Sequence, residues 1–461
     1  MPRNNPPAFS GVQPHLAQVA DLGPPRSECG VGCLMPWAGK LYVLNYVSHR
    51  KDTGRGTSLR VIDPDMNMHM VEEARGVDGT YTNRFIHFPS NRLIIGPHVI
   101  DADHRIHTVD ELVDIRVCGT TWHLSDPEHL VYVLGMEGEL FELNPRTLEC
   151  RQVMDLQQCL DTQGEFMVHF KDCYCHLGRL VVCSNEYFEE DWAGRRCQGR
   201  LAEWDGKKWT IIERRPFVAI YGRGAFAPTI FATGWDQASA ILSVYTKHTG
   251  QWTRYRLPKA SHCFDHKWQT EWPRMRETEH ERILMDAHGM FYELSPHAYG
   301  GRVWGVRPVS THLWVLGDFC TWRGLLVMGA DNASPSSGDS CTTAEPQSGL
   351  WMGKTDDLWR FGAPAGWGGP WWNTLVNARE PSDPYLMTGF RNKCIHISHD
   401  AGSEVDFDIE VDFMGHGSFE KYMTLRTGRY ANHAFPTGFG AHWIRLIPSR
   451  ACTASAQLHY T

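Results

Sequence analysis

The sequence predicts an all-β protein, a seven-bladed β-propeller followed by a small C-terminal β-sheet unit. Three observations lead to this fold class. The chain of 461 residues contains 43 Gly, 26 Pro and 18 Trp, which indicates many turns and aromatic-lined surfaces. Helical periodicity is nearly absent. One strand pattern, a small or basic residue followed by Leu or Ile and further apolar residues, occurs seven times along the chain.

These repeats set the predicted number of blades. Their apolar anchors are Leu41, Leu93, Leu130, Leu180, Ile241, Ile283 and Leu325. Successive anchors are 37 to 61 residues apart, with a mean of about 47, and a four-stranded blade needs about 40 to 50 residues. Seven anchors therefore predict seven blades. A pair of β-sandwiches is the alternative, because sandwiches also place strands at short spacing.

The composition along the chain predicts four segments. Residues 1–28 form a Pro-rich N-terminal extension in which residues 11–19 could supply a closing strand, and residues 29–361 form the propeller. Residues 362–382 form a connector rich in Trp and Gly, whose indoles could bind sugars but in a connector more often cover a domain edge. Residues 383–461 alternate with period two and form the C-terminal β unit.

Charge and cysteine content exclude some classes of protein. The formal charge of -8 includes no long basic run, so nucleic-acid and membrane binding are not expected, although an acidic protein can hold a cationic pocket for a sugar acid. The first residues lack the apolar core of a signal peptide, and no segment is long enough to span a bilayer. Most of the 14 cysteines are expected to be free thiols, with one or two disulfide bridges as the alternative if the protein is exported.

The stretch 76–109 contains the densest group of candidate functional residues. Two predicted strands, at 84–88 and 93–95, are flanked by Asn83, Arg84, His87 and His98. In a propeller, the starts of inner strands and the exits of second strands meet at one mouth of the central channel, so equivalent positions of other blades become neighbours. Asn185, Tyr221 and Arg223 are such positions. For any single residue, the simpler reading is a polar group that only satisfies the backbone or channel water.

Metal sites and catalytic motifs are weaker signals. Cys173, Cys175 and His176, and the pair Cys29 and Cys33, lack a second pair at zinc-ribbon spacing, so buried thiols are favoured. Acidic loops at 186–191 and 331–339 could hold a structural Ca²⁺ through oxygen ligands, and the metal content stays open. The sequence contains no Gly-rich phosphate loop, Gly-x-Ser-x-Gly elbow or His-Glu-x-x-His motif.

Two segments resemble a known family. The motif NRFIHFPSNRLIIGPHVID at 83–101, and QSGLWMGKTDDLW at 347–359 continuing to Trp371 and then DPYLMTG at 383–389, are similar to the seven-bladed L-rhamnose-α-1,4-D-glucuronate lyases that act on gum arabic. Ulvan lyases and rhamnosidases of the same fold are related to these lyases. The resemblance implies a secreted, monomeric enzyme acting on an acidic polysaccharide with rhamnosyl-glucuronate ends, with no cofactor required by the chemistry.

The resemblance also implies roles for the candidate residues. His98 and His87, with Tyr221 as a further partner, would transfer protons, and Asn83, Arg84, Arg223 and Asn185 would bind the uronate. An α-L-rhamnosidase is the alternative enzyme and would need two carboxylates, for example Glu165 and Glu186. A non-catalytic propeller that binds glycans or proteins is the alternative from another class.

Overall fold

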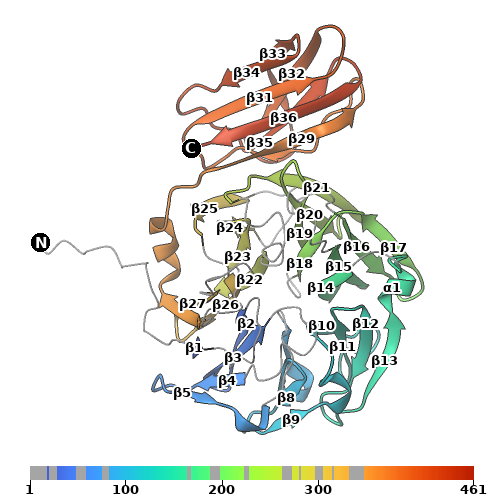
Figure 1. Ribbon diagram of the computed structural model, residues 1–461, viewed down its shortest axis with the longest axis vertical. Helices are drawn as coiled ribbons and strands as arrows, with labels where there is room; N and C mark the ends of the chain where they lie inside the picture. The colour runs from blue at the N-terminus through green and yellow to red at the C-terminus, as the bar shows by residue number, and fades with distance from the viewer. Residues whose placement is uncertain are drawn as a thin grey trace, which may run out of the picture.

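The structure is a computed structural model, and it describes residues 18–19, 29–47, 59–74, 83–163, 168–186, 198–222, 228–261, 273–279, 282–295, 305–313, 316–331 and 347–461. Within these ranges the chain is built almost entirely of β-strands (Figure 1). The single α-helix among them, α1 (Leu156–Cys159), has four residues. Short 3₁₀ turns complete the list: η1 (Glu72–Ala74), η2 (Phe88–Ser90), η3 (Asp110–Leu112) and η6 (Thr355–Arg360). No described helix is long and apolar enough to cross a membrane.

The first 28 strands form seven four-stranded antiparallel units in the described part of the chain. Units one to three contain β2 (Cys29–Trp37), β3 (Lys40–Val47), β4 (Leu59–Ile62) and β5 (Met68–Met70); β6 (Arg84–His87), β7 (Arg92–Ile95), β8 (His98–Ile100) and β9 (Ile106–Thr108); and β10 (Val117–Trp122), β11 (Val131–Gly135), β12 (Glu139–Leu143) and β13 (Cys150–Asp155). Units four and five contain β14 (Val168–His176), β15 (Arg179–Glu186), β16 (Gly199–Trp204) and β17 (Trp209–Glu213), then β18 (Phe217–Gly222), β19 (Thr229–Trp235), β20 (Ala240–Thr246) and β21 (Gln251–Leu257). Unit six contains β22 (Arg274–Glu279), β23 (Arg282–Ala287), β24 (Met290–Leu294) and β25 (Arg307–Thr311), and unit seven β26 (Leu316–Trp322), β27 (Leu325–Asp331) and β28 (Gln347–Gly353) with β1 (Gln18–Val19).

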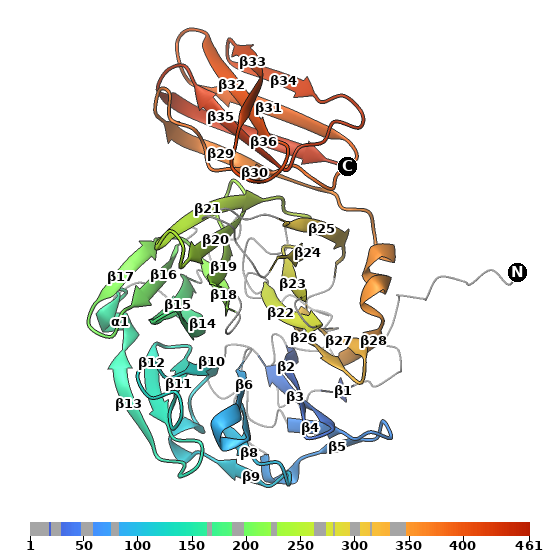
Figure 2. The ribbon, with the colours of Figure 1, turned by 180° about the vertical axis from the view of Figure 1, so that it is seen from behind.

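These units are the blades of a β-propeller. They are arranged around a common centre, with β2, β6, β10, β14, β18, β22 and β26 innermost (Figure 1, and from behind in Figure 2). The seventh blade is completed by the N-terminal strand, because Gln18 pairs with Ser348 of β28. Pairing of the first strand with the last blade closes the ring. The predicted all-β propeller is therefore confirmed.

The apolar runs used to predict the blades are strands buried on both faces. In β7, Leu93 and Ile95 pack in a core with the first blade, whereas Ile94 packs in a core with the third. A strand covered on both faces is apolar without alternation, which explains the repeated pattern. The fifth anchor, Ile241, lies one strand too far out, in β20 instead of β19. Both strands are fully buried, so their sequences look alike, and the misplacement accounts for the longest spacing, 61 residues.

Side chains join neighbouring inner strands, which have one free edge toward the centre. Asp318 of β26 accepts the backbone N–H of Leu34 in β2 at 2.9 Å, and Asp172 of β14 accepts that of Ile220 in β18 at 2.9 Å. Each carboxylate lies at a break in its strand's pairing register. These bulges turn a polar side chain toward the next blade, where it satisfies a backbone donor that would otherwise be buried unpaired.

The C-terminal unit is a sandwich of two four-stranded layers. One layer has the order β29 (Gly366–Val376), β36 (Cys452–Tyr460), β31 (Lys393–His399) and β34 (Tyr430–Ala434), and the other β30 (Tyr385–Leu386), β35 (Trp443–Pro448), β32 (Val405–Asp412) and β33 (Glu420–Thr427). Alternate residues of both layers, such as Ile395 and Phe407, are buried in one core. The segment 362–382, expected to be a connector, contains β29 and so contributes an eleven-residue strand to this sandwich.

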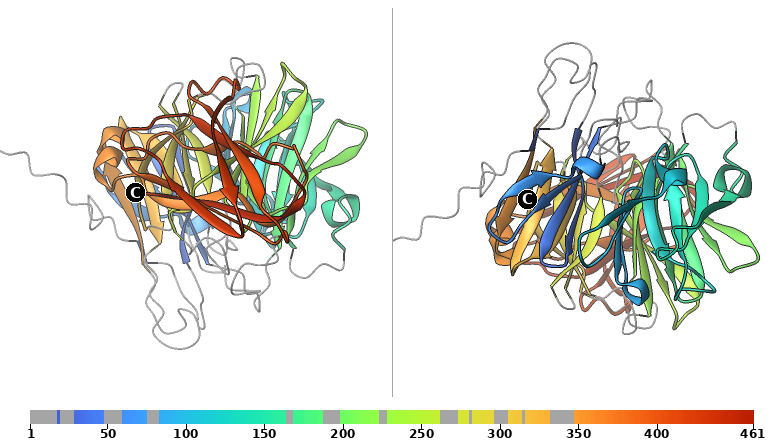
Figure 3. Two further views of the ribbon diagram at one scale, coloured as in Figure 1. Left: turned by 90° about the horizontal axis from the view of Figure 1, so that it is seen from above. Right: turned by 90° about the horizontal axis from the view of Figure 1, so that it is seen from below.

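The sandwich is fused to the fifth blade. Strand β30 pairs in parallel with β21, at Arg256 and Tyr385, so blade and sandwich share one eight-stranded sheet. The buried Arg256 contacts Asp236 of the blade and Asp383 of the sandwich, both at 2.9 Å. Views from above and below show the sandwich at one end of the molecule and blades one to three at the other (Figure 3). The C-terminal unit is thus fixed against the propeller by a sheet and a buried ion pair.

Candidate functional site

The inner strands begin at one face of the propeller, which we call the front face. Arg84, the first residue of β6, pairs with Ile95 at the end of β7, and Arg274, the first residue of β22, pairs with Asp286 near the end of β23. The starts of inner strands and the ends of second strands therefore meet at the front face, as the sequence predicted. The inner strands end at the opposite, rear face.

A buried carboxylate of the seventh blade contacts arginines of the second and sixth blades near the front face. Asp318 is fully buried and lies between Arg84 and Arg276, with Nε to carboxylate distances of 2.5 and 2.8 Å. Burial alone would raise the pKa of Asp318, but the guanidinium groups of Arg276 and Arg84 outweigh it and lower the pKa. Asp318 is therefore ionised at neutral pH and holds both arginines in place.

Arg276 keeps part of its hydrogen-bonding capacity. Its Nε donates to Asp318 and its Nη1 donates to the carbonyl of Met275 at 2.8 Å. Its Nη2 has no hydrogen-bond partner among the described residues, and 13% of the side chain is exposed. A guanidinium fixed at one edge and free at the other is suited to a carboxylate ligand.

The charge around Asp318 favours an anionic ligand. Arg274 is almost fully buried and donates from Nε to the carbonyl of Gly317 at 2.9 Å. Across the centre, burial raises the pKa of Asp172 to about 6, although Arg276 and Arg274 act in the opposite direction. The inner cluster, which we define as Arg84, Arg274, Arg276 and Asp318, carries three positive charges against one negative charge, and Asp172, with its pKa of about 6, adds a second negative charge across the centre at neutral pH.

Asn83 is a structural residue in this arrangement. It is fully buried, and its Nδ2 donates to the carbonyl of Gly96 at 2.8 Å. Its Oδ1 accepts a hydrogen bond from the Thr120 hydroxyl of the third blade, and its backbone carbonyl lies 3.6 Å from Cys33 Sγ of the first blade. Because its amide is used within the protein, Asn83 joins three blades instead of contacting a uronate.

His98 does not lie at the centre of the propeller. It is on β8, the third strand of its blade, and is 2% exposed. Its cross-strand neighbour Ile95 belongs to the core shared with the first blade, and its Nδ1 lies 3.0 Å from the Thr108 hydroxyl of the same blade. Burial lowers the pKa of His98 to about 4. The turn at Pro97 directs the side chain between two blades, not toward the front of the central axis as expected.

His87 lies at the other end of its strand. It is the last residue of β6, at the rear face, and is fully buried. Its two ring nitrogens lie 2.7 Å from the Ser90 hydroxyl and 2.9 Å from the Pro127 carbonyl of the third blade. Burial lowers its pKa. The structure therefore separates His87 from both Arg84 and His98, and both ring nitrogens have structural partners.

The remaining candidates have different positions. Tyr221 is on the inner strand β18, partly exposed, and its hydroxyl lies 3.4 Å from Glu277 Oε2 of β22. Asn185 is buried on the second strand β15, opposite His169. Arg223 and Glu165 lie outside the described residues, whereas Glu186 ends β15. Of the predicted site residues that the structure describes, Arg84 and Tyr221 belong to the centre of the propeller.

The described residues contain no group of three or more His, Cys, Asp or Glu side chains that could hold a metal ion. Cys33, Cys173 and Cys175 are buried free thiols, as expected for apolar strand positions. The acidic loops considered for Ca²⁺ are only partly described, since 187–197 and 332–346 lie outside the described ranges. The metal therefore remains an expectation from sequence.

The sequence analysis missed Arg274, Arg276 and Asp318. A usable signal was present in the alternation of Arg274, Arg276 and Thr278, which places two guanidinium groups on the same face of one strand. This strand precedes the sixth anchor by one hairpin and is therefore an inner strand. Asp318 had no such signal, because only the ring of blades brings it to Arg84, 234 residues away.

Comparisons with known proteins find only distant likenesses. No protein-family model matches the chain, and no curated protein is similar to it. Among solved structures it is similar to a luciferin-regenerating enzyme, with 10% identity over 74% of this chain and 97% of that one and a TM-score of 0.37. It is also similar to the β-propeller domain of Cps50 (Swd1) from Myceliophteria thermophila, with 12% identity, coverage of 71% and 98%, and a TM-score of 0.40. A chain of the mitotic checkpoint complex has 10% identity, coverage of 73% and 91%, and a TM-score of 0.41. Likenesses this distant carry no functional assignment.

Proposed function

We propose that the protein is a polysaccharide lyase that cleaves L-rhamnose-α-1,4-D-glucuronate ends by β-elimination, releasing rhamnose and leaving a 4,5-unsaturated glucuronate. One observation carries the proposal. Arg276 is held on an inner strand by Asp318, and its Nη2 has no partner among the described residues. Together with the resemblance of the 83–101 and 347–389 segments, this supports recognition of an acidic sugar at the front of the propeller.

The chemistry requires such a group. In β-elimination a base removes the C5 proton of the glucuronate, the electron pair forms the C4–C5 double bond, and the C4–O4 bond breaks while an acid protonates the departing oxygen. The C5 proton is too weakly acidic unless the carboxylate charge is stabilised as the enolate develops. In this proposal Arg276 bonds the carboxylate directly, while Arg84 and Arg274 add positive potential around it.

Proton transfer is assigned differently from the sequence prediction. His87 and His98 are buried away from the inner cluster, so neither is retained as base or acid. Tyr221 keeps the role proposed from the sequence because its hydroxyl is on an inner strand beside β22, although Tyr221 is the fifth of the six residues of β18 and so lies nearer the rear face than the inner cluster does. A tyrosine can serve as base or acid when it lies within hydrogen-bond reach of the proton transferred.

The test uses gum arabic as the substrate and follows two products. Free rhamnose and the ultraviolet absorbance of the conjugated enoate should rise together with wild-type protein. Rhamnose without the enoate would identify a rhamnosidase. Formation of neither product would indicate a binding protein, and both results would contradict the lyase. Arg276→Met should lower kcat/KM by about 10-fold to 150-fold, the value of a hydrogen bond to a charged group. Arg445→Met, which removes an arginine paired with Glu410 in the sandwich, is the matched control and should be active.

A further inference from the structure

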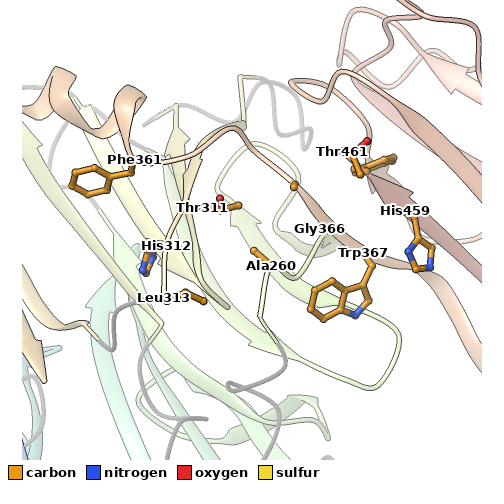
Figure 4. A pocket seen from close by; sticks show the side chains of 11 residues that line it. Ala260, Thr311, His312, Leu313, Phe361, Gly366, Trp367, His459 and Thr461 are labelled. Atoms are coloured by element: carbon orange, nitrogen blue, oxygen red, sulfur yellow. The ribbon is translucent and has the colours of Figure 1, made fainter. Parts of the chain in front are cut away.

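A cavity lies where the propeller meets the sandwich. It has a volume of about 640 Å³, which is within the range of small-molecule sites. Figure 4 shows that its walls come from the sixth blade, from the segment between Phe361 and Trp367, and from the end of β36 at His459. We call this space the rim cavity. It shares no lining residue with the inner cluster.

Wall residues of the rim cavity lie at the same face as the inner cluster. Its wall residue Thr311 ends β25, which runs in the same direction as β23 because both are antiparallel to β24. Strand β23 ends at the front face, so β25 does too. Ala260, another wall residue, follows β21. Its N–H donates to the carbonyl of His288 in the β23–β24 turn, so Ala260 also lies at the front face.

The lining residues select a neutral ligand with both apolar and hydroxyl surfaces. None of them is Asp, Glu, Lys or Arg. Trp367 and Phe361 provide aromatic faces, and Thr311 and Thr461 provide hydroxyl groups. A pyranose ring has an apolar C–H face that packs on an indole and a rim of hydroxyl groups that bond to hydroxyls and imidazoles. Among the described residues that line the cavity, no charged side chain is present as a counter-ion for a charged sugar.

His312 supplies a polar group that has no partner within the described protein. Its Nε2 lies 2.8 Å from Asp286 Oδ1, and a carboxylate accepts, so Nε2 carries the proton. The ring packs on Phe291 at 4.5 Å between centroids, and only 4% of the side chain is exposed. Its Nδ1 is buried without a hydrogen-bond partner among the described residues. In the tautomer that the contact with Asp286 selects, Nδ1 is an acceptor for a ligand hydroxyl.

We propose that the rim cavity binds a neutral sugar residue, with its ring on Trp367 and a hydroxyl donated to His312. That this sugar belongs to the same glycan whose uronate lies at the inner cluster rests on the proposed function. Asp286 supports a single glycan across both places, because it bonds His312 and is the cross-strand neighbour of Arg274. The cavity and the inner cluster are therefore separated by one strand pair and one hydrogen bond along the front of the sixth blade.

Isothermal titration calorimetry tests the proposal. It compares the neutral sugars D-galactose, L-arabinose and L-rhamnose with the charged sugar sodium glucuronate. At least one neutral sugar should bind wild-type protein, and Trp367→Ala should weaken it by about tenfold or more. The backbone pairing of Trp367 with Lys259 does not depend on the indole, so the fold is retained. Trp372→Ala, on the same strand and 47% exposed outside the cavity, is the matched control and should bind normally.

Two further variants keep the result interpretable. Leu313→Asp changes an 88% exposed wall residue and should also weaken neutral sugars without unfolding the protein. Arg276→Met should weaken glucuronate but not neutral sugars, whereas Trp367→Ala should do the reverse. Absence of neutral-sugar binding, or equal binding by wild type, Trp367→Ala and Leu313→Asp, overturns the rim site. If wild-type protein forms no enoate product but still binds a neutral sugar, only the proposed lyase is overturned.

Discussion

Substitution of His98 by glutamine should remove a specific part of the protein's pH-dependent stability. Burial lowers the pKa of His98 from its usual 6.5 to about 4. The unfolded chain therefore binds a proton between these pH values that the folded protein does not bind, so acid favours unfolding. The stability contributed by neutral His98 is complete above pH 6.5 and is lost as the pH falls toward 4.

The size of this effect follows from the two pKa values. At about pH 5 the unfolded histidine is almost fully protonated and the folded one is mostly neutral, which costs about 2 kcal/mol of the free energy of unfolding. Below pH 4 the loss approaches roughly 3 kcal/mol. Glutamine fills a similar volume and can still bond the Thr108 hydroxyl, but it does not titrate.

Urea unfolding of wild type and His98→Gln, at about pH 7.5 and pH 5, measures the difference directly. Wild type should lose about 2 kcal/mol more than the variant between these conditions. His69→Gln is the control, because His69 is 62% exposed and should show the wild-type dependence. Equal pH dependence of wild type and His98→Gln would refute the buried, neutral state of His98. Normal turnover by folded His98→Gln would agree with a structural role of His98. A loss of turnover of about 100-fold without any change in stability would instead support the catalytic role predicted from the sequence.

Three other predictions concern Arg276, Asn83 and the junction between propeller and sandwich. Arg276→Met should weaken glucuronate by about 10-fold or more but leave its methyl ester almost unaffected in calorimetry, because only the acid offers a carboxylate; equal losses would argue against this contact. Asn83→Ala should lower the free energy of unfolding by about 1 to 3 kcal/mol, measured in urea, with unchanged preference between acid and ester; a selective loss of the acid would return Asn83 to the binding site. Asp236→Asn should remove about 2 kcal/mol of stability at pH 7, because Arg256 overcomes the effect of burial and lowers the Asp236 pKa to about 2. That contribution is present above pH 4 and disappears as the pH falls toward 2, so a constant difference between Asp236→Asn and wild type over this range would contradict it.

The 83–101 motif shows why residue density is an uncertain guide to a site. Its polar groups are close in sequence, but the strand separates them by about 3.3 Å per residue and alternates their direction. Arg84 therefore begins at the front face and His87 ends at the rear face of the same strand. A hairpin of this kind requires polar side chains at both ends, because its turns contain backbone groups that neighbouring blades cover.

The sequence by itself determined the architecture. Seven apolar runs, each buried between two blades, repeat at the spacing of a four-stranded unit, and the physical cause is that a strand covered on both faces must be apolar throughout. The same reasoning identified a C-terminal unit with alternating strands. It could not separate β19 from β20, since both are fully buried and look alike to any hydropathy pattern.

Only the tertiary structure decided the composition of the site. Asp318 meets Arg84 and Arg276 across separations of 234 and 42 residues, and this contact depends on the closure of the ring and on a bulge in β26. The rim cavity likewise exists only because β30 pairs with β21 and brings the sandwich against the sixth blade. Local patterns record which side chains are buried, whereas charge pairing and cavity walls depend on which distant strands become neighbours.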